Sequence, residues 1–160
     1  MTIYWDLDGC LRLLDRVFIG REANRWGELD DKGMSLHEVF NNDPALGLIA
    51  EPSEYIEMAN TLPEIHFITS QPLTWQKYAA MWIKRHIHVP YDIIFTRGCD
   101  AKLAILKPGD FLIEDSPLFS EYSCIIMVDR AYNQHVNCPI RVKSAEELRF
   151  VIHEIEDMGY

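Results

Sequence analysis

The chain has 160 residues, of which 48% are hydrophobic and 11% aromatic, and its formal net charge is −10 at pH 7. This length suits one domain with a substantial core, and the composition excludes a disordered or low-complexity protein. The negative charge argues against extended binding of nucleic acid or anionic membranes, which needs basic patches, although a bound divalent cation could still attract an anionic small substrate.

The sequence also bears on the compartment of the protein. No apolar run is long enough to span a bilayer, and the first residues lack the basic and apolar regions of a signal peptide. The cysteines are widely spaced and include no C-x-x-C pair: Cys10, Cys99, Cys124 and Cys138. We expect reduced, mostly buried thiols rather than a zinc site or disulfides, and therefore a cytoplasmic protein that does not bind membranes.

A short run of β-forming residues at the start of the chain ends in Asp6, Asp8 and Gly9. We interpret it as a buried strand that brings acidic side chains to its carboxyl end, where ligands of open α/β sheets bind. Asp8 is expected in the following turn, facing the same site from another side. Taken alone, the two aspartates could equally be an acidic turn, because Asp-Gly is a common turn dipeptide.

Residues 11–50 interrupt the alternation of strands and helices, and we interpret them as a small helical cap inserted after the first strand. Within them, Ser35 and Glu38 have the spacing of a capping box and predict a short helix that ends near Phe40. A further helix, over about residues 53–62, is expected to lead back to the core.

The rest of the chain alternates between short apolar runs and segments with helical spacing. The runs predict strands over residues 64–68, 91–95, 111–113 and 124–128. A last extended piece is expected over residues 139–142. Helices are expected over residues 73–86, 101–106 and 118–122, and after a second capping box at Ser144 and Glu147. Because strands separated by helices form βαβ units, we expect a single α/β domain over residues 1–160. It should have a Rossmann-like parallel sheet of about five strands with helices on both faces.

Three of the expected strands end in side chains that can bind a metal or a phosphate: Asp6 and Asp8, Thr69 and Ser70, and Glu114 and Asp115. The carboxyl ends of parallel strands share one edge of a sheet, so these groups should converge, together with Lys102 from a short helix. Carboxylates suit Mg²⁺, whereas hydroxyl groups and a lysine suit a phosphoryl group. The pattern predicts a metal-assisted phosphoryl-transfer site.

Some of these residues also have a purely structural interpretation. Thr69 or Ser70 could cap the next helix, and Lys102 could be an ordinary solvated lysine. A structural role is least expected for Asp6, because an unpaired carboxylate at a buried strand end is costly. Four aromatic residues could contact a substrate but are expected in the core: Trp26, Phe40, Tyr55 and Trp75.

Four segments, in chain order, resemble the four motifs of the haloacid-dehalogenase-like (HAD) phosphohydrolases. They are Asp6-x-Asp8-Gly9 after an apolar strand, Phe-Ile-Thr-Ser at 67–70, Lys102, and Leu-Ile-Glu-Asp at 112–115. Each motif alone is weak, but the ordered set on consecutive strand ends is specific. Within this superfamily the chain is most similar to the 5'(3')-deoxyribonucleotidase group, through residues 69–72 and 129–133. Lys107 stays open as an alternative to Lys102, and Glu114 as an alternative to Asp115.

The resemblance implies a Mg²⁺-dependent phosphomonoesterase, a hydrolase that acts through an aspartyl-phosphate. Asp6 would be the nucleophile, and Asp8 would be the general acid and base. The resemblance assigns the Mg²⁺ ligands to Asp6, the backbone carbonyl of Asp8, and Asp115. It assigns the substrate phosphate to Thr69 or Ser70, and Lys102.

The implied substrate is a nucleoside monophosphate, which makes the protein similar to a 5'-nucleotidase. One alternative is another small phosphomonoester, such as a sugar phosphate or a polynucleotide end. A second alternative is a non-catalytic module that binds Mg²⁺ and a phosphorylated ligand. The sequence leaves open the preferred base and sugar and whether the protein is a homodimer.

Overall fold

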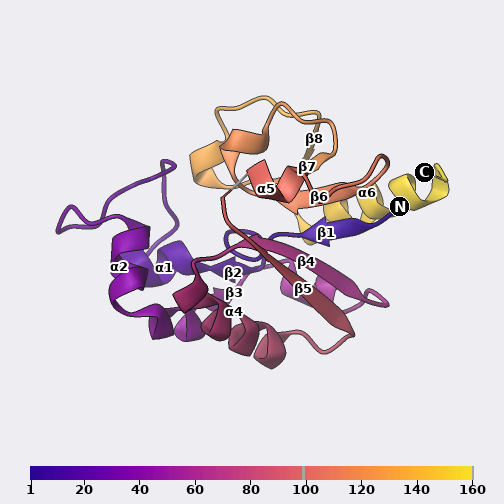
Figure 1. The fold of residues 1–160 in the computed structure, drawn as a ribbon. Coiled ribbons are helices and arrows are strands. Elements are labelled where there is room, and N and C mark those ends of the chain that lie inside the picture. The colour runs from indigo at the N-terminus through magenta and orange to yellow at the C-terminus, as the bar shows by residue number, and fades with distance from the viewer. Residues whose placement is uncertain (99, 160) are drawn as a thin grey trace.

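A parallel sheet with helices packed against both faces forms the centre of the computed structural model, which describes residues 1–98 and 100–159 (Figure 1). Within these ranges the sheet has six strands in the order β5-β4-β1-β6-β7-β8, and every neighbouring pair is parallel. The strands are β1 (Ile3–Trp5), β4 (Ile65–Ser70), β5 (Tyr91–Thr96), β6 (Phe111–Glu114), β7 (Ile125–Val128) and β8 (Ile140–Val142). The predicted Rossmann-like α/β architecture is therefore confirmed.

The sheet has one strand more than the predicted number. The extended piece expected over residues 139–142 pairs with β7, where Ile126 lies opposite Ile140 and Val128 opposite Val142. This pairing completes the burial of β7, whose residues are all buried, as expected for an interior strand of a parallel sheet. From β1 the chain builds outward to β4 and β5, then returns to the other side of β1 with β6. This is the kind of switch point at which open α/β sheets bind ligands.

The helices of the main fold divide between the two faces of the sheet. One face packs Trp5, Phe67 and Ile113 in a cluster with α3, α4 and α6, and the other packs Leu112 and Met127 against η2. The bounds are α3 (Ile56–Ala59), α4 (Leu73–His86), α5 (Asp100–Leu103), η2 (Pro117–Phe119), η3 (Ala131–Asn133) and α6 (Ala145–Asp157). The α4 bounds match the prediction. The helices expected over 53–62, 101–106 and 118–122 are shorter, and the last is a 3₁₀ turn.

The segment between β1 and β4 forms a second, smaller unit at the carboxyl end of β1 (Figure 1). Two short antiparallel strands, β2 (Arg12–Leu13) and β3 (Glu51–Pro52), form a ribbon at its base. Between them lie α1 (Leu14–Ile19), α2 (Leu36–Asn42) and η1 (Pro44–Ile49). We call residues 14–50 the insertion. A small apolar cluster of Leu14, Phe40, Ala50 and Trp75 joins it to α4.

The first predicted capping box is confirmed at α2, where the Ser35 hydroxyl accepts from the Glu38 amide and Glu38 accepts from the Ser35 amide. At α6 the hydroxyl of Ser144 accepts from the Glu147 amide, but the Glu147 carboxylate accepts from the amide of Lys143 instead. The second box is therefore only half formed.

Three cysteines lie within the described residues and all are free thiols: Cys10, Cys124 and Cys138. Cys10 is buried and the other two are half-buried, while Cys99 lies outside the described residues. None of the helices in the described part of the chain has both the length and the apolar character needed to span a bilayer.

Candidate active site

The carboxyl ends of the three middle strands meet beside the insertion. Asp6 directly follows β1, Thr69 lies near the end of β4, and β6 ends at Glu114 with Asp115 next to it. Lys102 reaches the same place from α5. The structure thus brings together side chains that are up to about a hundred residues apart in the sequence, as a parallel sheet allows.

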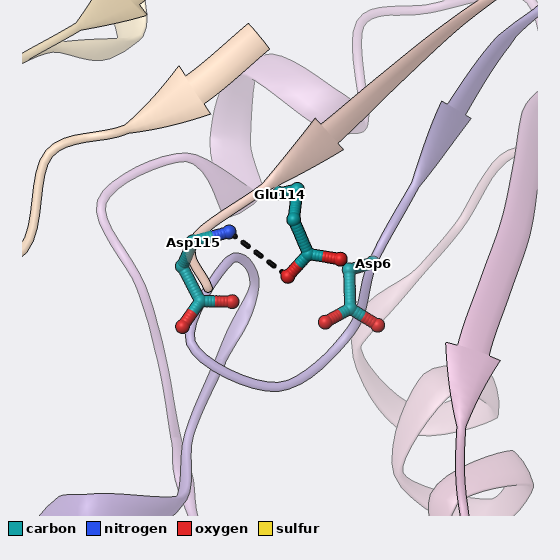
Figure 2. A group of neighbouring side chains, drawn as sticks. All are labelled: Asp6, Glu114 and Asp115. Atoms are coloured by element: carbon teal, nitrogen blue, oxygen red, sulfur yellow. Dashed lines mark hydrogen bonds between the residues drawn. The ribbon is translucent and has the colours of Figure 1, made fainter. Parts of the chain in front are cut away.

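Three buried carboxylates form the centre of the site. One oxygen each of Asp6, Glu114 and Asp115 lies within 4.8 Å of the other two. Figure 2 shows them gathered at the ends of β1 and β6, with Glu114 between the two aspartates. Hard oxygen donors at this spacing are suited to a divalent cation such as Mg²⁺.

Lys102 is the cation of this cluster. Its Nζ lies 2.9 Å from Asp6 Oδ1 and 2.7 Å from Glu114 Oε2, and the residue is only 3% exposed. Burial alone would lower the pKa of Lys102, but the two carboxylates raise it overall, so the amine stays protonated. Lys107 is exposed and does not line the site, so of the two lysines it is Lys102 that lies beside Asp6.

The two aspartates are poorly neutralised in spite of Lys102. Burial raises the pKa of Asp6 to about 7, with Lys102 acting against it and Glu114 adding to it. Burial, followed by the charges of Glu114 and Asp6, raises the pKa of Asp115 well above its usual range. Among the described residues Asp6 Oδ1 accepts no well-aligned hydrogen bond, although Lys102 is close. Such desolvated carboxylates need a further positive charge to stay ionised.

Glu114 and Asp115 have different surroundings. Glu114 Oε2 accepts from Lys102, and its Oε1 accepts from the backbone amides of Asp115 and Ser116, each at 3.1 Å. Both of its oxygens are therefore already engaged by the protein. Asp115 accepts from the Tyr132 hydroxyl through Oδ2, while the one hydrogen-bond contact of Oδ1 among the described residues is a weak one with Cys10 Sγ at 3.8 Å. Asp115 is thus the acid of this pair with an oxygen free for a metal.

Asp8 stands apart from the buried cluster but lines the same cavity. Its Oδ1 lies 2.6 Å from Arg12 Nε, and its Oδ2 accepts from the side-chain amide of Gln71. Its side chain is 23% exposed, in contrast to buried Asp6. The two aspartates of the first motif therefore have different environments, as two different chemical roles would require.

Thr69 and Ser70 differ in what their hydroxyls contact. Ser70 Oγ is 2.8 Å from Thr96 Oγ1 and 3.0 Å from the Gly98 carbonyl oxygen, so it links β4 to β5 and the following loop. The Thr69 hydroxyl is buried and meets the Gln71 amide at 3.4 Å. Neither hydroxyl caps α4, whose N-terminus at Pro72 has no side-chain cap. Thr69 therefore has the hydroxyl better placed to donate to a phosphoryl oxygen.

A cavity of about 330 Å³ extends from these strand ends to the insertion. Much of the remaining lining is apolar and aromatic, from Leu14, Phe18, Trp26, Leu36 and Trp75. Polar and charged side chains also line the cavity: Asp15, Arg25, Glu28, Ser35 and His37. Phe40 and Tyr55 are buried in the core as expected, and buried Trp75 also borders the cavity. The expectation was wrong for Trp26, which is 48% exposed on a polar loop, with its ring 5.5 Å from that of Tyr132 between centroids.

Four residues of the site were not among the predicted site residues: Arg12, Gln71, Arg130 and Tyr132. Arg130 Nε donates to the Gly9 carbonyl at 2.7 Å, which fixes the turn after β1 to the end of β7. One sequence signal pointed to Arg12, a lone charge within the apolar run from Leu11 to Leu14. The other three lie in segments 69–72 and 129–133, which carry the family resemblance, but their contacts arise from tertiary packing and gave no sequence signal for a role in the site.

Comparisons with models of known protein families, with curated proteins and with solved structures found no match. The function has to be inferred from the chemistry of the site itself.

Proposed function

We propose that the protein is a Mg²⁺-dependent phosphomonoesterase of the HAD-like type that hydrolyses nucleoside monophosphates through an aspartyl-phosphate. The observation that carries the proposal is the pairing of Asp6 with Lys102 inside a buried acidic cluster, two residues before the more exposed Asp8. A nucleophile, a phosphate-binding cation and a separate acid–base group then all border one cavity.

The residues present are suited to Mg²⁺. The donors are all oxygens, and within the described residues Asp6 Oδ1 accepts no well-aligned hydrogen bond although Lys102 Nζ lies 2.9 Å away. The raised pKa values of Asp6 and Asp115 indicate carboxylates short of positive charge. Asp6 and Asp115 would hold the ion, together with the backbone carbonyl of Asp8. When bound, Mg²⁺ supplies charge that offsets the repulsion between these carboxylates and a phosphate.

The side chains of the chain itself would carry the two chemical steps. An Asp6 oxygen attacks phosphorus, the ester P–O bond breaks, and Asp8 gives its proton to the departing alkoxide. Asp8, now a carboxylate, takes a proton from the water that attacks phosphorus, which releases inorganic phosphate and restores Asp6. Lys102 and the Thr69 hydroxyl would bind the remaining phosphoryl oxygens, while Ser70 is engaged by Thr96.

The aromatic wall of the cavity supports a nucleoside as the leaving group. Phe18, Trp26 and Trp75 border the same cavity as the acidic cluster, and base–aromatic stacking contributes about 1–3 kcal/mol per base. A sugar phosphate would gain no base stacking from these rings. The net charge of −10 disfavours a polynucleotide end.

A panel of phosphate esters tests the substrate class. Phosphate release with Mg²⁺ would be measured for several nucleoside monophosphates, for glucose 6-phosphate and for an oligonucleotide with a terminal phosphate. We expect the nucleoside monophosphates to have the highest kcat/KM. Equal turnover of the sugar phosphate would refute the nucleotidase assignment, and no release from any ester would favour a non-catalytic binding module.

The Asp6→Asn variant tests the nucleophile. We expect it to fold, as judged by circular dichroism, and to release no phosphate, because an amide cannot form the aspartyl-phosphate. Asp157→Asn, at an exposed position at the end of α6, is the matched control and should keep full activity. Phosphate release by Asp6→Asn at the wild-type rate would exclude Asp6 as the nucleophile.

A further inference from the structure

The carboxylate of Asp8 is held by the protein at both of its oxygens. Arg12 Nε lies 2.6 Å from Oδ1, and the side-chain amide of Gln71 donates to Oδ2. The two donors come from different parts of the fold, Arg12 from β2 and Gln71 from the residue after β4. A carboxylate held from two sides has little freedom to rotate.

Arg12 is itself fixed in place. It is 2% exposed, and its guanidinium lies 6.0 Å from the centre of the Trp82 ring and packs against Gly47 of η1. Its backbone amide donates to the Leu7 carbonyl, and its carbonyl accepts from Gly9, each at 2.9 Å. The guanidinium is therefore a rigid element of the turn that carries Asp8.

Burial of this arginine is costly unless a carboxylate pairs with it. Within residues 1–98 and 100–159, Asp8 is its ion-pair partner. Arg12 is buried, whereas the Asp8 side chain is 23% exposed and borders the cavity. Arg12 and Gln71 therefore hold the Asp8 carboxylate in place, while the carboxylate stays accessible from the cavity.

We propose that Arg12 and Gln71 are positioning residues that aim Asp8 at the oxygen of the leaving group. This inference rests on the proposed phosphatase function. Each carboxylate oxygen that accepts one hydrogen bond keeps a second lone pair, so Asp8 can still carry a proton in the cavity. Loss of either donor lets the carboxylate turn away, and a displacement of about 1 Å can lower the rate about 10²-fold.

Two probe substrates separate this role from a structural one. In thymidine 5'-monophosphate the departing alkoxide needs a proton, whereas 4-nitrophenolate is a weak base that departs without one. For Arg12→Gln we expect kcat/KM to fall about 10²-fold with thymidine 5'-monophosphate but less than about tenfold with 4-nitrophenyl phosphate. Arg16→Gln, which removes an exposed ion pair with Glu51 from the same region, should change neither value. Equal losses on both substrates would overturn the proposal.

A double-mutant cycle gives a second criterion. If Arg12 acts through Asp8, then Asp8→Asn with Arg12→Gln should lose no more activity than Asp8→Asn alone. Independent losses that multiply would contradict the proposal. If Arg12→Gln does not fold, Gln71→Leu is tested instead with the same two substrates and the same double-mutant cycle. This variant removes the other hydrogen-bond donor to Asp8 without leaving a buried charge. A wild-type protein inactive on both esters would refute the proposed function, whereas an active wild type with unselective variants would refute only the positioning role.

Discussion

Tyr132 is the residue that connects the acidic cluster to the wall of the cavity. Its hydroxyl donates to Asp115 Oδ2, and its ring packs against Trp26 of the insertion. This hydrogen bond engages Oδ2 and not Oδ1, and it holds the carboxylate in one orientation. Hydrogen bonds of this kind to a metal-binding carboxylate raise the affinity for the metal.

Removal of the Tyr132 hydroxyl should therefore weaken Mg²⁺ binding. For Tyr132→Phe we expect the Mg²⁺ concentration that gives half-maximal phosphate release to rise about 10-fold, with the maximal rate changed much less. Titration of activity with Mg²⁺ measures this shift. Tyr122→Phe, at an exposed position, is the control. An unchanged Mg²⁺ requirement in Tyr132→Phe would show that this bond does not order Asp115 for the proposed metal binding.

Among the elements, the turn after β1 imposes the strictest steric limit. Gly9 has a φ of +79°, which side chains rarely adopt, and a Cβ at this position would overlap the carboxylate of Asp115. The turn thus brings the backbone of the first motif against the acid that follows β6. Only glycine allows this approach.

Two glycine variants distinguish the cost of backbone strain from the cost of steric overlap with Asp115. Gly33 has a φ of +75° with open space around it, so Gly33→Ala should cost only the strain, about 1 kcal/mol. Gly9→Ala should cost several kcal/mol of unfolding free energy and at least about 10-fold in activity, because Asp115 has to move. Urea unfolding and phosphate release measure the two effects. Similar behaviour of both variants would mean that the contact with Asp115 does not matter.

The elements that could be predicted are those whose pattern is local. The bounds of α4 and the capping box of Ser35 follow from helical spacing and from a hydroxyl that satisfies an amide nearby in the chain. The β2–β3 ribbon pairs only two residues from each side, about 40 residues apart, so no local signal reveals it. The turn over Pro117–Phe119 is short because few residues connect β6 to β7.

For the whole molecule, the buried carboxylates set the pH dependence of stability without metal. Burial raises the pKa of Asp6 from 3.8 to about 7 and raises that of Asp115 well above its usual range. The unfolded chain releases these protons at lower pH than the folded chain does. The contribution of these groups to stability is therefore fully present below about pH 4 and is lost as the pH rises through 7.

We expect the metal-free protein to have a lower free energy of unfolding at pH 8 than at pH 5, by a few kcal/mol. Urea unfolding in the presence of a chelator at the two pH values measures this difference. Asp6→Asn removes one of the titrating groups and should flatten the dependence. Saturating Mg²⁺ should raise stability at pH 8 more than at pH 5, because it binds the ionised carboxylates. A larger stability at pH 8 without metal would contradict the assignment.

The convergence of the site could be predicted because parallel strands place their ends at one edge. This is why Asp6, Thr69 and Asp115 lie together although they are distant in sequence. The choice of Lys102 over Lys107 required the structure, since the two lysines are only five residues apart, with Lys102 in α5 and Lys107 just after it. The contacts of Arg12 and Tyr132 depend on how the insertion and η3 pack. Such tertiary packing leaves no periodic pattern in the sequence from which it could be predicted.

The β2–β3 ribbon has a consequence for how such a protein can diversify. Because its two strands lie side by side, residues 14–50 leave and rejoin the core at one place. For a loop whose ends are already closed, doubling its length costs only about 0.6 kcal/mol in chain entropy. The loops of the insertion can thus change in length at a small thermodynamic cost. Under the proposed function, new substrates could be selected there while the acidic strand ends stay as they are.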